Sequence, residues 1–430
     1  MPNLIRSGAA SRLVLAIALA SGLTLAAAAP AQAAKKAEKK AEEAGPKTNY
    51  SKPFVALYQP FAAKLNAGGD LTPLVAEVAA IVAAAQTADD KFAAGQVATS
   101  LGAKLQNNAL QRQGVALMVD SGSTQMGADR AKFLFALAQM AYQDKDWAQA
   151  RARAEQAIAA GYPGDAELLL SEVHFAEGQA ATGLDVLDRA IARKIAAGQP
   201  VPEAWLKRAL ANAYQANLEP QAFKFAGMFA QYYPSQTSWG DAINIQRNLR
   251  NYEGQELLDL LRLAQRTDSL RNERDFVDYI SAADARRLPG ETQRIIAAGI
   301  AAGKLKSNDV FVAEANTVAS GRVKADTADL VNLARDARLP SATVATLMAA
   351  GDAFLSYGKA AEAEEFYTKA LAKPGADTPR VLTRLGIAQL DQGKVVEAQA
   401  SFDKVEGARQ AIARLWGLYA TQSAKAPVAQ

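Results

Sequence analysis

The sequence predicts an all-α fold, a solenoid of stacked helix pairs, and two observations support this prediction. Near the C-terminus a set of small and aromatic residues recurs 35 positions later. The set is Gly351, Gly358, Ala363, Tyr367 and Ala370, which returns as Gly386, Gly393, Ala398, Phe402 and Val405. Alanine, the best helix former, is abundant throughout, and no stretch alternates apolar and polar residues as a half-buried strand would. A fixed period of this length indicates one helix pair that has been copied and stacked.

The N-terminus has the order of a secretory signal peptide. Arg6 and Arg12 give a basic start, an apolar run extends from Leu13 to Leu25, and small residues surround Pro30. The alternative is an uncleaved membrane anchor, but the apolar run is shorter than the ~20 residues that a spanning helix needs. We therefore expect residues 1–33 to be removed and the protein to be periplasmic, with secretion as the alternative.

Charge and cysteine content exclude several classes of protein. The chain has no cysteine, which rules out a disulfide framework and a thiolate metal site. The formal net charge of +4 comes from the signal peptide and from residues 34–52, which carry six lysines and three glutamates. The rest of the chain is nearly neutral, so no basic face for nucleic acid is expected.

Residues 34–52 are rich in lysine, alanine and glutamate and contain few large apolar residues. Such a segment does not bury enough surface to offset its ordering entropy, so a solvated linker is the expected structure. The alternative is a weak electrostatic contact with an anionic envelope surface, made by four lysines. These are Lys35, Lys36, Lys39 and Lys40.

Five segments share the same spacing of small, aromatic and turn residues. The clearest runs from Leu347 to Pro374 and the next from Leu382 to Phe402; the others begin near Leu134, Leu170 and Leu210. This spacing resembles the tetratricopeptide repeat family. The resemblance implies a right-handed superhelix of helix-turn-helix units that binds partners, mostly along the surface lined by the first helix of each pair. In the segment that begins near Leu210, the pattern fits only if the turn near Asn217 is one residue short.

The segments that match less well complete the organisation of the chain. Residues 53–130 and 266–340 are helical, alanine-rich and degenerate, whereas 131–265 and 341–406 hold the repeats. Residues 407–424 predict a capping helix with one apolar stripe, and 425–430 a frayed tail. On the capping helix we expect Arg409, Gln410 and Arg414 to face water.

No motif predicts a catalytic, cofactor or metal site. His174 is the only histidine and stands where neighbouring repeats place a packing aromatic. Gly299 to Leu305 departs from a phosphate-binding loop in spacing and in its last residue, so we interpret it as helix packing at Gly299 and a helix end at Gly303. Glu362, Glu364 and Glu365 open a helix, where negative charge is favourable in any case.

Two surfaces are candidates for partner binding. The segment from Tyr214 to Trp239 is rich in aromatic residues, most of which we expect to fill helix grooves. Its contact candidates are Tyr232, Tyr233 and Trp239, near a predicted loop. The second candidate is the first-helix surface implied by the family resemblance. It includes Lys132, Phe135, Gln139, Gln143, Glu172 and Phe175.

The arginines between Arg247 and Arg287 are matched in number by acids. This balance predicts a solvated, salt-bridged face and not a binding site.

These features together predict a non-catalytic scaffold that binds proteins or peptide segments in a bacterial cell envelope. The alternatives are a protein that binds peptidoglycan or polysaccharide and a wall-cleaving enzyme built on a helical superhelix.

Overall fold

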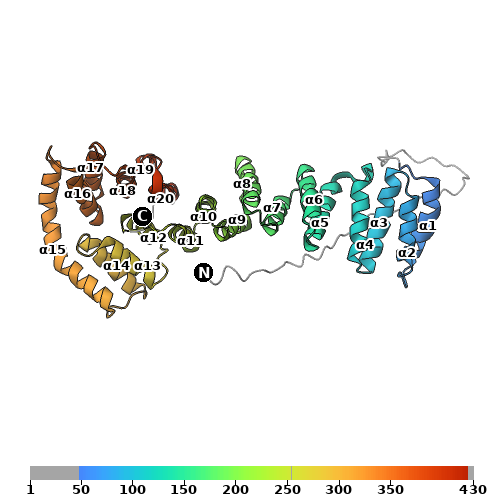
Figure 1. The fold of residues 1–430 in the computed structure, drawn as a ribbon, viewed down its shortest axis with the longest axis horizontal. Coiled ribbons are helices and arrows are strands. Elements are labelled where there is room, and N and C mark those ends of the chain that lie inside the picture. The colour runs from blue at the N-terminus through green and yellow to red at the C-terminus, as the bar shows by residue number, and fades with distance from the viewer. Residues whose placement is uncertain (1–47, 253, 425–430) are drawn as a thin grey trace, which may run out of the picture. The chain divides into compact units, whose positions relative to one another are not determined.

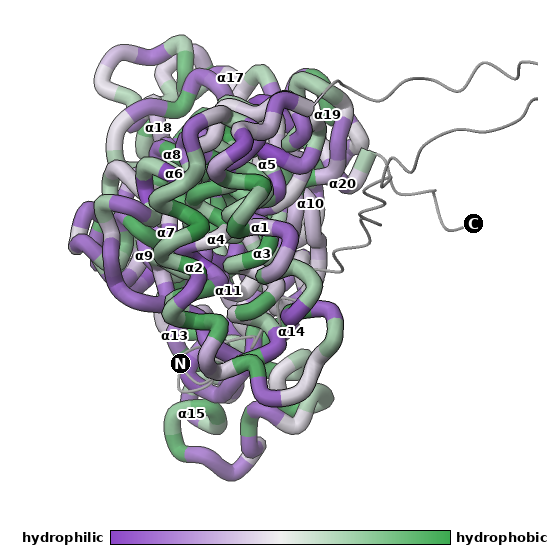
Figure 2. Tube along the Cα trace, turned by 90° about the vertical axis from the view of Figure 1, so that its right-hand side faces the viewer, coloured by the Kyte–Doolittle hydropathy of each residue, from purple (hydrophilic) through white to green (hydrophobic). Residues whose placement is uncertain are grey.

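Successive helices of this chain pack on one another in neighbouring pairs (Figure 1). The structure is a computed structural model that describes residues 48–252 and 254–424. Its described residues form twenty α-helices and no β-strand. Hydrophobic and hydrophilic residues are interspersed along the chain (Figure 2), and in most helices the buried residues recur every three or four positions, as on one face packed against neighbours. The predicted all-α solenoid of tetratricopeptide-like helix pairs is confirmed.

The first helices of the chain are α1 (Lys52–Ala67), α2 (Leu74–Ala84), α3 (Ala88–Lys104), α4 (Asn108–Asp120), α5 (Arg130–Gln143), α6 (Trp147–Ala159), α7 (Ala166–Ala176), α8 (Ala180–Ala196) and α9 (Glu203–Gln215). They are followed by α10 (Glu219–Tyr232), α11 (Gln236–Leu249), α12 (Gly254–Arg266), α13 (Glu273–Ala283), α14 (Pro289–Ala301), α15 (Val310–Arg338), α16 (Val344–Ser356), α17 (Ala360–Leu371), α18 (Thr378–Asp391), α19 (Val395–Phe402) and α20 (Gln410–Ser423). Short 3-10 helices, η1 (Thr124–Asp129) and η2 (Gly407–Arg409), precede α5 and α20.

Several sequence predictions concern residues that the structure does not describe. The predicted signal peptide (1–33), the four lysines at 35, 36, 39 and 40, and the predicted tail (425–430) lie outside the described residues. Within residues 48–252 and 254–424, no helix is both long enough and apolar enough to cross a bilayer.

The five predicted repeats each coincide with a helix pair joined by a three-residue turn. The central residue of each turn has a positive φ. These central residues are Lys145, Gly178, Asn217, Gly358 and Gly393. The residue after the centre donates its amide to a carbonyl five positions back, as Lys359 does to Phe354 at 2.9 Å, which satisfies the end of the first helix. The turn at Asn217 has full length, so the expectation of a turn one residue short is wrong.

Where the two helices of a pair touch, one helix contributes a small residue and the other a large one, and which helix contributes the large one differs between repeats. In α16–α17 a Cβ on Gly351 would lie 2.5 Å from the Tyr367 ring, so only glycine fits there. Aligned on the turn, Leu210 takes the place of Gly351 in α9–α10, and Ala226 takes the place of Tyr367. Both are buried. The sequence pattern therefore missed the register because the large residue had moved to the other helix.

The segment predicted as degenerate over 266–340 contains one helix much longer than the others. Helix α15 has 29 residues. Its Val312 belongs to the apolar core of α12–α14, and its Leu330 and Ala334 belong to the core that includes α16 and α17. Helix α15 therefore joins two packed groups of helices by inserting one end into each.

Helix α20 packs on α19 of the last pair, as expected for a capping helix, and it also contacts helices far earlier in the chain. Its Gln422 donates to the Ala230 carbonyl of α10 at 2.8 Å, and its Trp416 indole donates to the Asp259 carbonyl of α12 at 2.9 Å. Arg409, expected to face water, is only 5 % exposed. The expectation fails for Arg409 because this residue pairs with Asp259 of α12, whereas Arg414 is exposed as expected and Gln410 is half-buried.

Candidate binding groove

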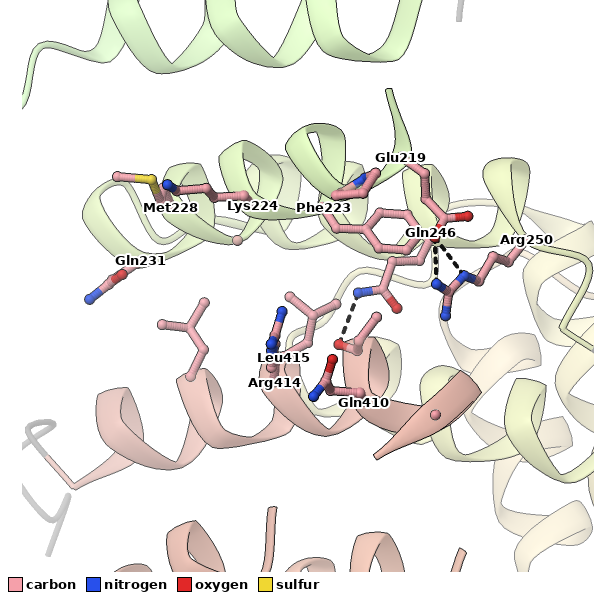
Figure 3. A pocket seen from close by; sticks show the side chains of 15 residues that line it. Glu219, Phe223, Lys224, Met228, Gln231, Gln246, Arg250, Gln410, Arg414 and Leu415 are labelled. Atoms are coloured by element: carbon pink, nitrogen blue, oxygen red, sulfur yellow. Dashed lines mark hydrogen bonds and ion pairs between the residues drawn. The ribbon is translucent and has the colours of Figure 1, made fainter. Parts of the chain in front are cut away.

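A groove of about 680 Å³ lies between α10, the end of α11, and the segment η2–α20 (Figure 3). It exists because α20 returns to α10 without closing fully against it. The lining residues are Glu219, Pro220, Phe223, Lys224, Gly227, Met228, Gln231, Gln246, Arg250, Gly407, Gln410, Ala411, Arg414, Leu415 and Leu418.

The amphipathic pattern of α10 explains which of its faces lines the groove. Phe225, Ala226 and Phe229 are buried in the core. Phe223 and Met228 lie on the other side of the helix, where they are only partly buried and line the groove. Helix α10 therefore presents an apolar side to the core and a second, mixed side to the groove.

The floor of the groove is apolar, whereas the side chains at its rim are charged. Lys224 and Arg250 lie on its α10–α11 side and Arg414 on its α20 side. Arg250 is held by Glu219 at 2.9 Å and by the Ala408 carbonyl at 3.1 Å, and it lies over the Phe223 ring at 5.4 Å. The hydrogen bond with Glu219 raises the pKa of Arg250, which stays charged. The groove thus combines an apolar floor with an excess of positive charge.

The Gln246 side chain reaches into the space between α11 and α20 (Figure 3). Gln246 is 2 % exposed and its Nε2 donates to the Ala411 carbonyl at 3.0 Å. Its Oε1 accepts no hydrogen bond from the described residues. A buried acceptor left without a donor costs about 1–3 kcal/mol, so this oxygen is an unfilled acceptor beside the groove.

The aromatic contact candidates have different environments. Tyr232, at the end of α10, is 36 % exposed, and Tyr233 donates its hydroxyl to the Val201 carbonyl at 2.7 Å. Trp239 is 4 % exposed and packs edge-on against Tyr419 at 6.0 Å. The expectation that Trp239 lies at the surface is therefore wrong, because α20 covers it.

The candidates on the first-helix surface lie on α5 and α7, two helices that contact each other. Phe135 is half-buried and stacks on Tyr162 at 4.4 Å, and Gln139 is half-buried one turn later. Phe175 packs over Gly183, where a Cβ would come within 2.4 Å of its ring. None of these three residues lines the groove, so the structure separates them from the aromatic segment of α10.

A buried cluster of ionic side chains lies where α12 meets α18 and η2. Asp259 is fully buried and accepts from Arg262 at 3.1 Å, from Arg384 at 3.0 Å and from Arg409 at 2.5 Å. The prediction of a solvated face between Arg247 and Arg287 is therefore wrong for the α12 residues. Two of the partners of Asp259, Arg384 and Arg409, lie 125 and 150 positions away in the sequence.

The cluster extends to α14 and α16. Arg384 also donates to Asp352 at 2.5 Å, and Tyr367 donates its hydroxyl to the same carboxylate at 2.8 Å. Glu291 accepts from both ends of the Arg262 guanidinium, at 2.8 and 2.7 Å. These bidentate and shared bonds fix the relative positions of α12, α14, α16, α17, α18 and η2.

The three buried carboxyls of the cluster stay ionised. Burial alone would raise the pKa of each, but facing guanidiniums outweigh it, chiefly Arg384 for Asp259 and Asp352 and Arg262 for Glu291. The pKa of each therefore lies below its ordinary value. One sequence signal could have located the cluster: Asp259 and Arg262 interrupt a run of leucines in the middle of α12, and charged side chains within such a run are expected to be buried and paired.

The remaining motifs behave as packing elements. His174 is 7 % exposed and its Nδ1 lies 2.9 Å from Gln179 Oε1. A Cβ on Gly299 would lie 2.6 Å from Leu305, and Gly303 ends α14 with a φ of 64°, which confirms the packing interpretation of this segment. Within the described part of the chain, no group of histidine and acidic side chains has a metal-binding arrangement.

Comparison with known proteins gives likenesses in structure. No family model matches the chain, and no curated protein sequence is similar to it. A solved structure described as Naa15/Naa10 bound to HypK-THB is similar over 84 % of this chain and 66 % of the other, with a TM-score of 0.31 and 13 % sequence identity. The chain thus spans just under two thirds of the length of that solved chain.

Proposed function

We propose that this protein is a non-catalytic scaffold that binds segments of other proteins. The observation that carries the proposal is the groove between α10 and α20, which is open, apolar at its floor, and bordered by an unfilled hydrogen-bond acceptor. Binding surfaces are typically concave and mostly apolar, with a few placed polar groups. Affinity in such a site comes from a few anchors more than from total area.

The charge cluster supports a structural role over a catalytic one. A carboxylic acid that donates a proton near neutral pH needs a raised pKa. The buried carboxyls Asp259, Asp352 and Glu291 all have lowered pKa values and are bound to arginines. Because each carboxylate is bound to at least one arginine from another helix, the cluster holds these helices together.

We further propose that the partners are proteins of the bacterial cell envelope. This part of the proposal rests on the signal-peptide pattern of residues 1–33 and on the lack of cysteine in the sequence. Protease accessibility in cells with a permeabilised outer membrane, compared with intact cells, measures the compartment. Protection in both states would contradict a periplasmic location.

A site-specific cross-linking experiment in living cells tests the scaffold proposal. A photoreactive amino acid is placed at Phe223 or Met228 in the groove, at Tyr232 or Gln139 on the earlier candidate surfaces, and at Val331 as a control. Val331 is 76 % exposed on α15 and lies outside the groove. The scaffold proposal predicts defined protein adducts from at least one candidate position and none from Val331. Adducts with wall glycan alone would contradict it and favour a polysaccharide-binding protein.

A further inference from the structure

We propose that the groove between α10 and α20 holds an extended protein segment in which acidic side chains alternate with apolar ones. This inference rests on the proposed scaffold function and adds the chemistry of the bound segment. Three independent features of the groove carry it: a glycine in its floor, an unfilled acceptor, and the sign of its charge.

Gly227 lies in the middle of α10, where glycine costs about 1 kcal/mol relative to alanine. Most other mid-helix glycines are required by packing, with Gly321 of α15 as an exception; a Cβ on Gly386, for example, would lie 2.5 Å from the Phe402 ring. At Gly227 the nearest atom to such a Cβ is Leu415 Cδ2 at 4.0 Å, an ordinary contact. Its φ is not positive either. Since neither packing nor backbone geometry of this chain requires glycine there, its effect is to leave the groove floor open to a close approach.

The acceptor beside the floor can take an N–H or O–H donor. Gln246 Oε1 has none among the described residues, while its Nε2 is fixed on the Ala411 carbonyl. A bound helix has its amides engaged internally except at its N-terminus, which is its positive end and is disfavoured beside arginines. An extended segment has free backbone amides along its length. The unfilled oxygen therefore favours an extended segment over a helical one.

The charge of the rim selects acidic side chains. Arg250 and Lys224 have partners in Glu219 and in Asp188, the latter at 2.6 Å. Arg414 is exposed across the groove. Alternate side chains of an extended segment point to opposite sides. One row can therefore pack on Phe223, Met228 and Leu415 while the other places carboxylates near Arg414.

The groove differs in position from the first-helix surface. It lies on α10, the second helix of its pair, and it is completed by α20, which is nearly two hundred positions away in the sequence. Loss of the α20 contact would remove one wall. Binding here therefore depends on the return of the C-terminal helix, whereas binding on α5 and α7 would not.

The test uses the purified protein and short fluorescein-labelled peptides, with fluorescence anisotropy as the readout. One peptide alternates glutamate with leucine or phenylalanine; a second has lysine for glutamate; a third has serine for the apolar residues. Gly227→Leu fills the floor, and Gly321→Leu is the matched control, because Gly321 is an exposed helical glycine of α15 with nothing within 4 Å of its Cβ position. Circular dichroism checks that both variants remain helical.

The proposal predicts that the first peptide binds best, that Gly227→Leu weakens its binding by about tenfold or more, and that Gly321→Leu leaves it unchanged. Arg414→Glu should weaken binding of the first peptide and strengthen binding of the lysine peptide. If Gly227→Leu does not fold, Gly227→Ala and Arg414→Glu, which change only groove-facing positions, carry the test.

Two results would overturn the inference: equal binding by the acidic and the lysine peptide, or unchanged binding of the acidic peptide in both groove variants. Protein adducts from Gln139 or Tyr232 in cells, together with either result, would leave the scaffold proposal standing and remove only this groove from it. Absence of protein adducts at every candidate position would instead remove the scaffold proposal itself.

Discussion

Two regions of this chain use the same helix pairs in different ways. In the stack α1–α9, the helices that pack together are neighbours one or two places apart along the chain. In the region α10–α20, contacts also join distant segments, such as Gln246 with Ala411 and Arg409 with Asp259, which are 165 and 150 positions apart. The first region is held by contacts between helices one or two places apart, and the second is closed on itself.

The difference has energetic and functional consequences. A stack of nearest neighbours has a stability that is roughly a sum of local terms, so a change in one pair remains local. A closed region shares one set of buried charges among several helices, so removal of one charge affects all of them. The groove occurs in the closed region because α20 supplies its second wall.

The largest expected effect comes from Asp259→Asn. It leaves three guanidiniums, those of Arg262, Arg384 and Arg409, facing a neutral amide, and loss of one partner of a buried ionic group costs about 3–5 kcal/mol. Urea unfolding followed by tryptophan fluorescence measures this loss, and Trp416, whose indole donates to the Asp259 carbonyl, contributes to that signal.

The matched control in the α1–α9 stack is Glu172→Gln. Glu172 pairs with Arg208 at the surface, where such a pair contributes about 0–1 kcal/mol. Equal losses in the two variants would mean that the buried cluster is no more important than a surface pair, and the comparison would fail.

Lowering the pH should also destabilise the α10–α20 region more than helices α5–α8 of the α1–α9 stack. The pKa values of Asp259, Asp352 and Glu291 are lowered in the folded state. Their stabilisation is therefore fully present above the unfolded values of about 4, and it is lost as pH falls from there towards the folded values. Between pH 5 and pH 3 the α10–α20 region should lose more stability than α5–α8, where the described residues include no buried carboxylate.

Hydrogen exchange at pH values across this window, corrected for the intrinsic rate, measures both regions in one sample. Asp259→Asn should lose less stability on acidification than the unmodified protein, because one of the three carboxylates is already absent. An identical acid response in the two proteins would count against the assignment of the effect to this cluster.

A smaller and local effect is expected from Gly114→Ala in the α1–α9 stack. Its Cβ would lie 2.5 Å from the Thr99 amide nitrogen and 2.6 Å from the Gly95 carbonyl oxygen, both of which are backbone atoms of α3. Overpacking of this kind costs about 1–3 kcal/mol. Exchange should accelerate in α3 and α4 only; acceleration in α16–α20 as well would show that the stack is not a set of local units.

The smallest expected effect is an increase in stability. Lys145 has a φ of 61° at the centre of the α5–α6 turn, where glycine is favoured. Lys145→Gly should stabilise this pair by up to about 1 kcal/mol, seen as a higher urea midpoint. Ala152→Gly, within α6, is the control and should instead destabilise by about 1 kcal/mol.

The sequence predicted the local elements and missed the long-range ones. Helix pairs follow from the local spacing of glycine and alanine. The turns at Gly358 and Gly393 could therefore be predicted from the sequence. The partners of Asp259 and the return of α20 depend on which of several apolar stripes packs on which, and no local pattern decides that. Trp239 and Arg409 were expected at the surface because the segments that cover them come from distant parts of the chain. The groove could not be predicted because its walls are far apart in the sequence.

The most direct test of this account is hydrogen exchange of the intact protein and its Asp259→Asn variant at neutral pH. The cluster joins η2, which leads into α20, to α12, and α20 in turn contacts α10. The variant should therefore exchange faster in α12, α18, α20 and the groove side of α10. Exchange in α3–α8 should be unchanged. Faster exchange spread evenly over both regions, or confined to α12 alone, would contradict the closure of α10–α20 through the buried charges.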